Sequence, residues 1–466
     1  MRSEMKEYAQ KNESLSSPFL QNNSLYSSAV EGFSKLLKTE KIEYLVEKFF
    51  AGEQAIEDLL RGFWHQDHKV QKVIDEFSEN TLSNFYFPFG VVPNFILNNK
   101  NYCVPMVIEE SSVVAACSRS AKFWSTRGGF KAQVIESLKV GQVHFYWHGE
   151  AKKLQDFFKQ NKNSLMQHVA PLTENMQKRG GGLVDLELRD KSDLDPGYFQ
   201  LFGRFETCDA MGANFINTVL ESLADEWKDL VAASEVFAQE EKEVCIIMSI
   251  LSNYTPECLV RVWVECPVAD LNDPTLGMDA ELFAQKLIRA VKIAKMDTYR
   301  ATTHNKGIFN GIDAVVLATG NDFRAVEACG HTYAAREGSY AGLSDASVQD
   351  GIFKFWLEIP IAVGTVGGLT SLHPMAKFSL DLLRRPCANE LMQIIASVGL
   401  AQNFGALRSL VTTGIQKGHM KMHLMNILNH LGANEVEREK AKVYFAGKTI
   451  SFKSVRDYLA KIRMYQ

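Results

Sequence analysis

The chain has 466 residues, of which 46% are hydrophobic, and its 51 basic and 55 acidic residues leave a formal net charge of −4. A chain of this length and composition can bury a large core and divides into roughly two or three domains. The near-balanced charge excludes a basic surface for a nucleic acid backbone and a polybasic segment for anionic lipid.

The N-terminal segment and the cysteines indicate where the protein works. Residues 1–28 are polar and rich in Ser and Asn, so we expect a disordered leader rather than a signal peptide. No later segment approaches about 18 uninterrupted apolar residues. The eight cysteines form no C-x-x-C pair, and most stand in apolar contexts, as is typical of reduced thiols. The sequence therefore predicts a soluble cytoplasmic protein without a membrane partner.

Helical and strand-like periods alternate along the chain. The elements expected in chain order are helices from Gly32 to near Ser78, strands at 85–92 and 102–108, a helix from Ser111 or Ser112 as N-cap to Gly128, a strand at 142–147, a helix at 150–163, strands at 182–188 and 198–206, and a helix from Asp209 to about Leu230. Residues 243–413 mix strands with helices, and the segment from Gln416 onward is helical and basic-amphipathic.

The order strand, helix, strand, strand, helix is that of a small split β-α-β unit inserted into a larger domain. We therefore expect an α+β fold, with a large mixed helical and β domain and a small ferredoxin-like domain. The expected boundaries are a leader at 1–28, a large domain at 29–107 and 242–414, a small domain at 108–241, and a C-terminal segment at 415–466.

The stretch 299–327 carries a candidate oxyanion site. Lys306 stands among Asn305, Gly307 and Asn310, and Asp322 follows the apolar run 314–318 on a Gly-Asn turn. We expect this run to be a buried strand whose flanking turns present the two charges. An ammonium can follow a developing negative charge, and a nearby carboxylate can hold its protonation state. The alternative is a solvated lysine near an aspartate that caps a helix.

Two further motifs are weaker alone. Glu79, beside Asn80 and just before the aromatic strand, could be a proton donor, although a solvated turn glutamate is the simpler interpretation. The segment Asp209-Ala-Met211-Gly212-Ala213-Asn214 lies between a strand and a helix, where free N–H groups favour a phosphate. A helix that starts with Asp and has a small-residue packing face would look the same, and the G-x-G-x-x-G spacing is absent.

The histidines and cysteines leave several possibilities open. His419 follows a glycine at the expected start of a helix and could protonate a leaving thiolate. His423 lies four residues later, so one helix face could bind a metal, but no third ligand is evident. We expect His65 and His68 to face solvent. We expect Cys208 and Cys329 to be small buried thiols rather than nucleophiles.

Taken together, the chain resembles 3-hydroxy-3-methylglutaryl-coenzyme A reductase of the soluble bacterial type, class II. The matching blocks run from residue 32 to 420 in the order of the family. They are 32–36, Glu79-Asn80, 104–116, 209–214, 300–327, 364–370, 400–404 and 415–420.

The resemblance implies reduction of a thioester to an alcohol by two hydride transfers, giving mevalonate and free coenzyme A. It implies that Lys306 stabilises the carbonyl oxyanion, that Asp322 tunes it, that Glu79 supplies protons to the aldehyde stage and that His419 protonates the thiolate. Arg300 and Asn310 are expected to hold the free carboxylate of the substrate. The resemblance also implies a dinucleotide site on the small domain, a C-terminal flap and a homodimer with shared active sites, without a metal.

The cofactor preference depends on the end of the strand at 142–147. NAD-preferring relatives have an aspartate there, which binds the adenosine ribose and repels a 2′-phosphate. Here Trp147 and His148 occupy the neighbourhood, and Lys152 and Lys153 follow. This favours NADPH, with His148 as a cofactor-binding residue, although a small shift in alignment would place Glu150 in the slot and leave NADH possible.

Two other classes of function remain as alternatives. A thioesterase or acyltransferase acting on acyl-CoA would use Cys208 or Cys329 as its nucleophile. A non-catalytic homologue would lack the chemical residues, but Glu79, Lys306, Asp322 and His419 are all present.

Overall fold

The computed structural model describes residues 30–273, 277–412, 424–446, 448 and 450–464. The chain forms two compact units, one containing residues 1–87 and 415–466 and the other residues 88–414. The expected leader at 1–28 lies outside the described residues. The finer domain boundaries stay predictions.

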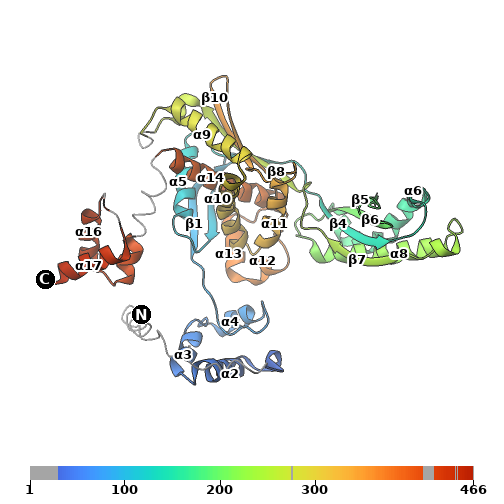
Figure 1. Cartoon of the computed structure of the whole chain (residues 1–466), viewed down its shortest axis with the longest axis horizontal. Coiled ribbons are helices and arrows are strands. Elements are labelled where there is room, and N and C mark those ends of the chain that lie inside the picture. Colours follow the sequence, from blue (N-terminus) through green and yellow to red (C-terminus); the bar gives the residue numbers. More distant parts are fainter. Residues whose placement is uncertain (1–29, 274–276, 413–423, 447, 449, 465–466) are drawn as a thin grey trace. The chain divides into compact units, whose positions relative to one another are not determined.

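The first unit is helical in its described parts (Figure 1). Its N-terminal part confirms the helices expected from Gly32 onward, and its C-terminal helices bury a small core that includes Leu428, Ala441, Val455 and Leu459. Its elements are η3 (Phe33–Lys35), α2 (Lys38–Phe50), α3 (Gln54–Gly62), α4 (His68–Asp75), α16 (Glu435–Tyr444) and α17 (Phe452–Met464).

The larger part of the second unit contains a hairpin and an antiparallel sheet. The hairpin pairs β1 (Phe89–Leu97) with β2 (Lys100–Val107). The strand expected at 85–92 therefore starts later, because Pro88 has no N–H to donate and Phe85 is exposed. The sheet has the order β3-β8-β10-β9 and consists of β3 (Lys131–Val134), β8 (Leu259–Pro267), β10 (Ile352–Pro360) and β9 (Ser344–Gln349).

A long buried helix, α14 (Ala388–Val411), runs through the core of this part. Among the described helices it alone is long and apolar enough to cross a membrane, but 67% of that apolar window is buried inside the protein, as in a core helix. The other helices here are α5 (Val113–Ser125), η5 (Val268–Leu271), α9 (Ala280–Met296), α10 (Thr298–Ala318), α11 (Phe323–Ala334), α12 (Leu369–Leu372) and α13 (Pro374–Leu382).

The strand expected at 314–318 was a wrong prediction, because these residues form the last turns of α10. The apolar run continues a helical pattern that starts earlier, with Ala301, Ile308, Ile312 and Val315 buried on one side. A short apolar run can belong to a buried strand or to a helix, and here the preceding three- and four-residue spacing decides for the helix.

The expected order of strand, helix, strand, strand and helix is confirmed; a further strand makes it a β-α-β-β-α-β unit, and its sheet is antiparallel with the order β5-β6-β4-β7 (Figure 1). The last strand completes the sheet beyond residue 241, where we expected the small domain to end. The elements are β4 (Lys139–Tyr146), α6 (Ala151–His168), α7 (Ala170–Gln177), β5 (Gly182–Asp190), β6 (Tyr198–Glu206), α8 (Ala213–Ala233), η4 (Gln239–Glu241) and β7 (Cys245–Leu251).

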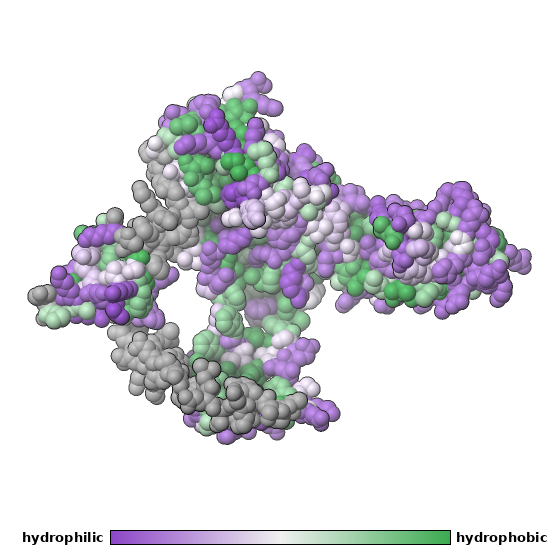
Figure 2. All heavy atoms as spheres, in the orientation of Figure 1, coloured by the Kyte–Doolittle hydropathy of each residue, from purple (hydrophilic) through white to green (hydrophobic). Residues whose placement is uncertain are grey.

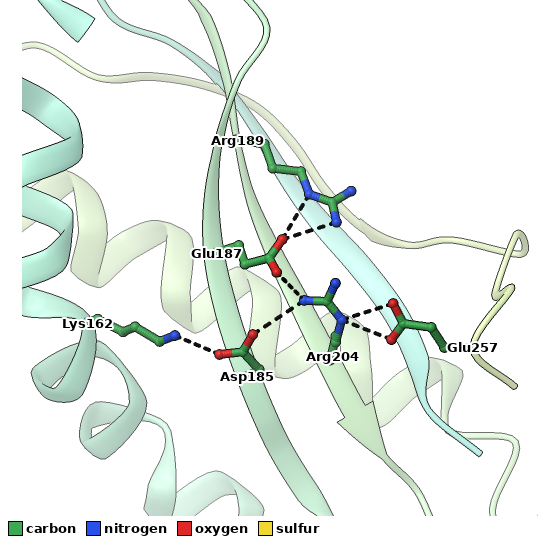
Figure 3. Close-up of polar contacts among 6 residues, drawn as sticks. All are labelled: Lys162, Asp185, Glu187, Arg189, Arg204 and Glu257. Carbon is green, nitrogen blue, oxygen red and sulfur yellow. Dashed lines mark hydrogen bonds and ion pairs between the residues drawn. The ribbon is translucent and has the colours of Figure 1, made fainter. Parts of the chain in front are cut away.

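The two faces of β6 differ. Phe199, Leu201 and Phe205 are buried in the core that α6 and α8 share with the sheet. Since side chains alternate along a strand, Arg204 lies on the other face. There it bonds Asp185 and Glu187 of β5 and Glu257, which lies shortly before β8 (Figure 3). This network ties the small sheet to the start of β8.

Hydrophilic residues cover much of the visible surface over α6 and α8 (Figure 2).

Candidate active site

Lys306 lies on α10, not on a turn as we expected, because the helix starts at the Asp297 cap and runs without interruption past this residue. The Lys306 side chain is 60% exposed, and its Nζ lies 2.7 Å from Oε2 of Glu110. Lys306, Asn310 and Asp313 follow at helical spacing, so they share the less buried face of α10. An exposed lysine on a well-packed helix can meet a substrate without reorganisation of the backbone.

The buried face of α10 fixes the position of Lys306. A Cβ on Gly311 would lie 2.8 Å from the carbonyl oxygen of Val398, so only glycine allows α10 and α14 to approach this closely. About two turns earlier, His304 Nε2 lies 2.7 Å from Oγ of Ser344, and the Ser344 hydroxyl donates to Asn403. Burial lowers the pKa of His304 to about 3, so the imidazole is neutral at physiological pH.

Arg300 and Asn310 also lie on α10, and both side chains are half-buried. Within the described part of the chain neither side chain has a hydrogen-bond partner. Burial lowers the pKa of Arg300, but an arginine stays charged. Both residues are therefore available to a substrate carboxylate, as the resemblance implies.

Asp322 caps the N-terminus of α11, with its Oδ1 accepting from the N–H groups of Arg324 and Ala325. The Arg324 guanidinium also bonds the carboxylate and, as the largest cause, lowers the pKa of Asp322. Asp322 is thus a carboxylate near neutral pH. Lys306 and Asp322 each have a different ionic partner here, Glu110 and Arg324, and Asp322 caps a helix, while the catalytic roles of both residues stay predictions.

The segment Asp209–Gly212 forms the entry to α8. Gly212 has a φ of +91° and its Cβ would lie 2.5 Å from Cγ2 of Thr207, so this position requires glycine. It is the N-cap of α8, and no side chain caps the first N–H groups, which include those of Ala213 and Asn214. These free groups and the positive end of the helix dipole suit a phosphate.

The segment Gly364–Thr365 joins this loop to the turn that carries Asp322. Thr365 N–H donates to the carbonyl of Asp209 at 2.8 Å, and Gly364 N–H donates to the side chain of Asn321 at 2.8 Å. A Cβ on Gly364 would lie 2.5 Å from the backbone nitrogen of Met211. The structure therefore brings together two motifs that are more than 100 residues apart in the sequence. The resemblance includes Gly364 in a matching block, but no pattern within the sequence indicates this contact.

The surroundings of His148 support NADPH less than the sequence suggested. His148 is exposed and Trp147 is buried. Lys152 pairs with Asp156 at 2.8 Å, and Lys153 pairs with Glu241. Both lysines that were expected to favour a 2′-phosphate are therefore already partnered by carboxylates, which leaves less free positive charge for that phosphate.

The remaining glutamate and histidine candidates lie outside the unit that contains Lys306 and Asp322. Glu79 is exposed and belongs to the first unit. His419 and His423 lie outside the described residues. His65 and His68 are exposed, as we expected. Within the described ranges no group of three or more His, Cys, Asp or Glu side chains could hold a metal.

The cysteines give no support to a nucleophile. Cys329 is buried and its Sγ accepts from the N–H of Thr255 at 3.4 Å. Cys208 is half-buried and its Sγ bonds the carbonyl of Arg179. Burial raises the pKa of both thiols, so neither is activated as a thiolate.

The comparisons with known proteins agree on one family. The sequence model of hydroxymethylglutaryl-coenzyme A reductase matches residues 40–424. The 3-hydroxy-3-methylglutaryl-coenzyme A reductase of Archaeoglobus fulgidus is 34% identical over 417 residues, covering 88% of this chain and 90% of that protein. The probable reductase of Borreliella burgdorferi is 32% identical over 94% of this chain and 98% of its own length. The class II reductase of Streptococcus pneumoniae, solved with bound NADPH in open conformations, is 36% identical with a TM-score of 0.68, covering 88% of this chain and 99% of that one.

Proposed function

Because the chain belongs to the hydroxymethylglutaryl-coenzyme A reductase family, we propose that it is the oxidoreductase that converts hydroxymethylglutaryl-CoA to mevalonate and free coenzyme A. The observation that carries this assignment is the junction of the Asp209–Gly212 loop with the turn before Asp322 through Gly364–Thr365. This contact supports the proposal because it joins the start of α8, whose free N–H groups suit a phosphate, to the turn that carries Asp322.

The reaction consumes two hydrides and two protons, and a bound nicotinamide cofactor supplies each hydride. The ammonium of Lys306 stabilises the oxyanion that forms at the thioester carbonyl. This interaction strengthens as the negative charge grows, so it lowers the barrier more than it stabilises bound substrate. Arg300 and Asn310 hold the free carboxylate and so orient the carbonyl toward the lysine.

The protons come from acids outside α10. When the carbon–sulfur bond breaks, His419 donates a proton to the coenzyme A thiolate. The aldehyde that remains accepts the second hydride, and Glu79 donates the proton that completes the alcohol. The resemblance assigns to Asp322, which Arg324 holds as a carboxylate in this structure, the role of tuning the charge of Lys306.

The cofactor is NADPH in this proposal, with NADH as the competing possibility. The NADPH in the Streptococcus pneumoniae relative supports the choice. Asp209, Met211, Gly212, Ala213 and Asn214 would form the dinucleotide site, together with His148. The free N–H groups at the start of α8 fit its phosphates.

The functional unit proposed is a cytoplasmic homodimer with shared active sites. Its support is the exposure of apolar side chains near the candidate site, since Leu372 on α12 is 62% exposed and Phe378 on α13 is 49% exposed. Such side chains favour an interface with another protein surface. The C-terminal segment 415–466 would close over the substrates as a flap.

The test is an absorbance assay of the reduced cofactor in the presence of hydroxymethylglutaryl-CoA, first with NADPH and then with NADH. The proposal requires about two molecules of cofactor oxidised for each coenzyme A released. Release of coenzyme A without cofactor oxidation would indicate a thioesterase or transferase instead. Binding without turnover would indicate a non-catalytic homologue.

A further inference from the structure

Lys139 is a buried lysine that the proposed mechanism does not use. Lys139 is the first residue of β4 and is 5% exposed, and it pairs with Phe205 of β6 in the sheet. Its ammonium donates to Oγ1 of Thr207 and, at 2.8 Å, to the carbonyl of Ala210. In the described residues no carboxylate forms an ion pair with it. A buried cation that no carboxylate bonds lowers the stability of the folded chain.

Both hydrogen bonds of the Lys139 ammonium go to one turn, which runs from Thr207 to Ala210. The hydroxyl of Thr207 donates to the carbonyl of Ala210 at 2.7 Å, and Ala210 N–H donates to the carbonyl of Thr207. The Ala210 carbonyl therefore accepts from both the lysine and the threonine. This turn leads directly into Met211 and Gly212, where the proposed dinucleotide loop meets α8.

The same ammonium lies where the two halves of the candidate site meet. A small cavity of about 10 Å³ is lined by Lys139, by Met211 from the dinucleotide loop and by Ala325 from the first turn of α11. This volume is close to the minimum that holds a single water molecule, so it has no room for a substrate group. Lys139 must act through the turn and through its charge.

We propose that Lys139 is a positioning residue for the dinucleotide, holding the Thr207–Ala210 turn so that the Asp209–Asn214 loop can receive the phosphates and adding positive charge beneath them. This inference rests on the proposed function. The negative charge of the bound cofactor offsets the cost of the buried ammonium, which nearby groups such as Glu206 and Asp209 offset only in part.

The first test compares NADPH affinity, measured by the fluorescence of the bound cofactor, in wild type, Lys139→Met and Lys139→Arg. Loss of a charged hydrogen-bond donor should raise the Kd for NADPH about tenfold or more in Lys139→Met, with partial recovery in Lys139→Arg. The KM for hydroxymethylglutaryl-CoA should change less than about twofold. Lys162→Met is the matched control, because Lys162 lies in the same β-α-β-β-α-β unit but bonds Asp185 (Figure 3).

The second test separates charge from packing. Burial lowers the pKa of Lys139, while Cys258, Glu206, Cys208 and Asp209 act in the opposite direction. Wild-type affinity for NADPH should therefore fall as the pH rises into the alkaline range, and Lys139→Met should lack this part of the pH dependence. A purely structural role would leave the two pH profiles parallel.

Two variants of Thr207, which accepts a hydrogen bond from Lys139, keep the test decisive if Lys139→Met does not fold. Thr207→Val removes the hydroxyl that joins the lysine to the turn and should weaken NADPH binding, whereas Thr207→Ser should retain it. Equal NADPH affinity in wild type and Lys139→Met, or in Thr207→Val and Thr207→Ser, overturns the role of Lys139. Intact NADPH binding without reduction of hydroxymethylglutaryl-CoA by wild type rejects the proposed function and leaves the inference standing.

Discussion

Lys306 and Glu110 form an ion pair between residues 196 positions apart, with Nζ and Oε2 separated by 2.7 Å. Glu110 precedes α5, so the pair joins the start of that helix to α10. Both side chains are open to solvent, and such a pair contributes about 0–1 kcal/mol to stability. Its importance is therefore positional, since it holds the ammonium on the exposed face of α10, where a substrate carbonyl can replace solvent.

Lys306→Ala should reduce the rate of hydride transfer by about 100-fold or more, because it removes the cation that meets the developing oxyanion. The melting temperature should hardly change. Lys100→Ala is a matched control, since Lys100 is also 60% exposed and pairs with a glutamate, Glu390, at 2.9 Å. Cofactor oxidation and thermal melting measure the two effects. Activity within tenfold of wild type in Lys306→Ala would exclude the proposed role.

His419→Ala should impair the reduction of hydroxymethylglutaryl-CoA but leave reduction of the corresponding free aldehyde largely active. The reason is chemical, because the aldehyde has no thiolate to protonate. Cofactor oxidation is measured with each substrate in turn, and Lys306→Ala should lose activity on both. If His419→Ala fails equally on the aldehyde, the histidine does not act as the acid for the thiolate.

Gly311→Ala should lower the stability of the protein by about 1–3 kcal/mol, because the added methyl group would overlap the Val398 carbonyl of α14. Gly307→Ala provides a control on the same helix. Its Cβ would lie 3.9 Å from Ala406, an ordinary contact, and alanine favours a helix by up to about 1 kcal/mol. Denaturant unfolding should therefore move the two variants in opposite directions, and equal destabilisation would contradict the proposed close approach.

Asp313→Asn should stabilise the protein more at pH about 8 than at pH about 4.5. Burial, together with the neighbouring Glu327, raises the pKa of Asp313, and its buried Oδ1 has no hydrogen-bond partner in the described residues. The folded chain therefore keeps a proton that the unfolded chain releases near pH 3.9, as for an ordinary aspartate, so this carboxyl costs increasing stability as the pH rises above about 4. Melting temperatures across this pH range measure the difference, which would be constant if Asp313 were ionised in the folded protein.

Arg204→Met should destabilise the protein by about 1–3 kcal/mol, since it leaves three carboxylates close together without their shared cation. Arg189→Met is the comparison, because Arg189 is more exposed and pairs with Glu187 alone, so its loss should cost about 0–1 kcal/mol. Both are measured by denaturant unfolding. Similar losses in the two variants would show that Arg204 does not join the small sheet to the segment before β8.

Alternating periods in the sequence were sufficient to predict the strand, helix, strand, strand and helix of the small unit, because strands and helices of ordinary length carry distinct spacings of apolar residues, whereas the last strand, β7, was not predicted. The helical stretch at the N-terminus followed from the same rule. The strand expected at 314–318 failed because a short apolar run fits either period, and packing of α10 against α14 resolved it. The residues of the candidate site were identified through the family blocks rather than through periodicity.

The sequence by itself determined the fold class, the family and the identity of the charged residues, since these depend on local spacing and on residue type. The tertiary structure decided which of those residues meet. It paired Lys306 with Glu110, and it joined the Asp209 loop to the Asp322 turn through Gly364. Such contacts link segments far apart in the chain and arise from the packing of whole elements, so no local pattern of residues specifies them.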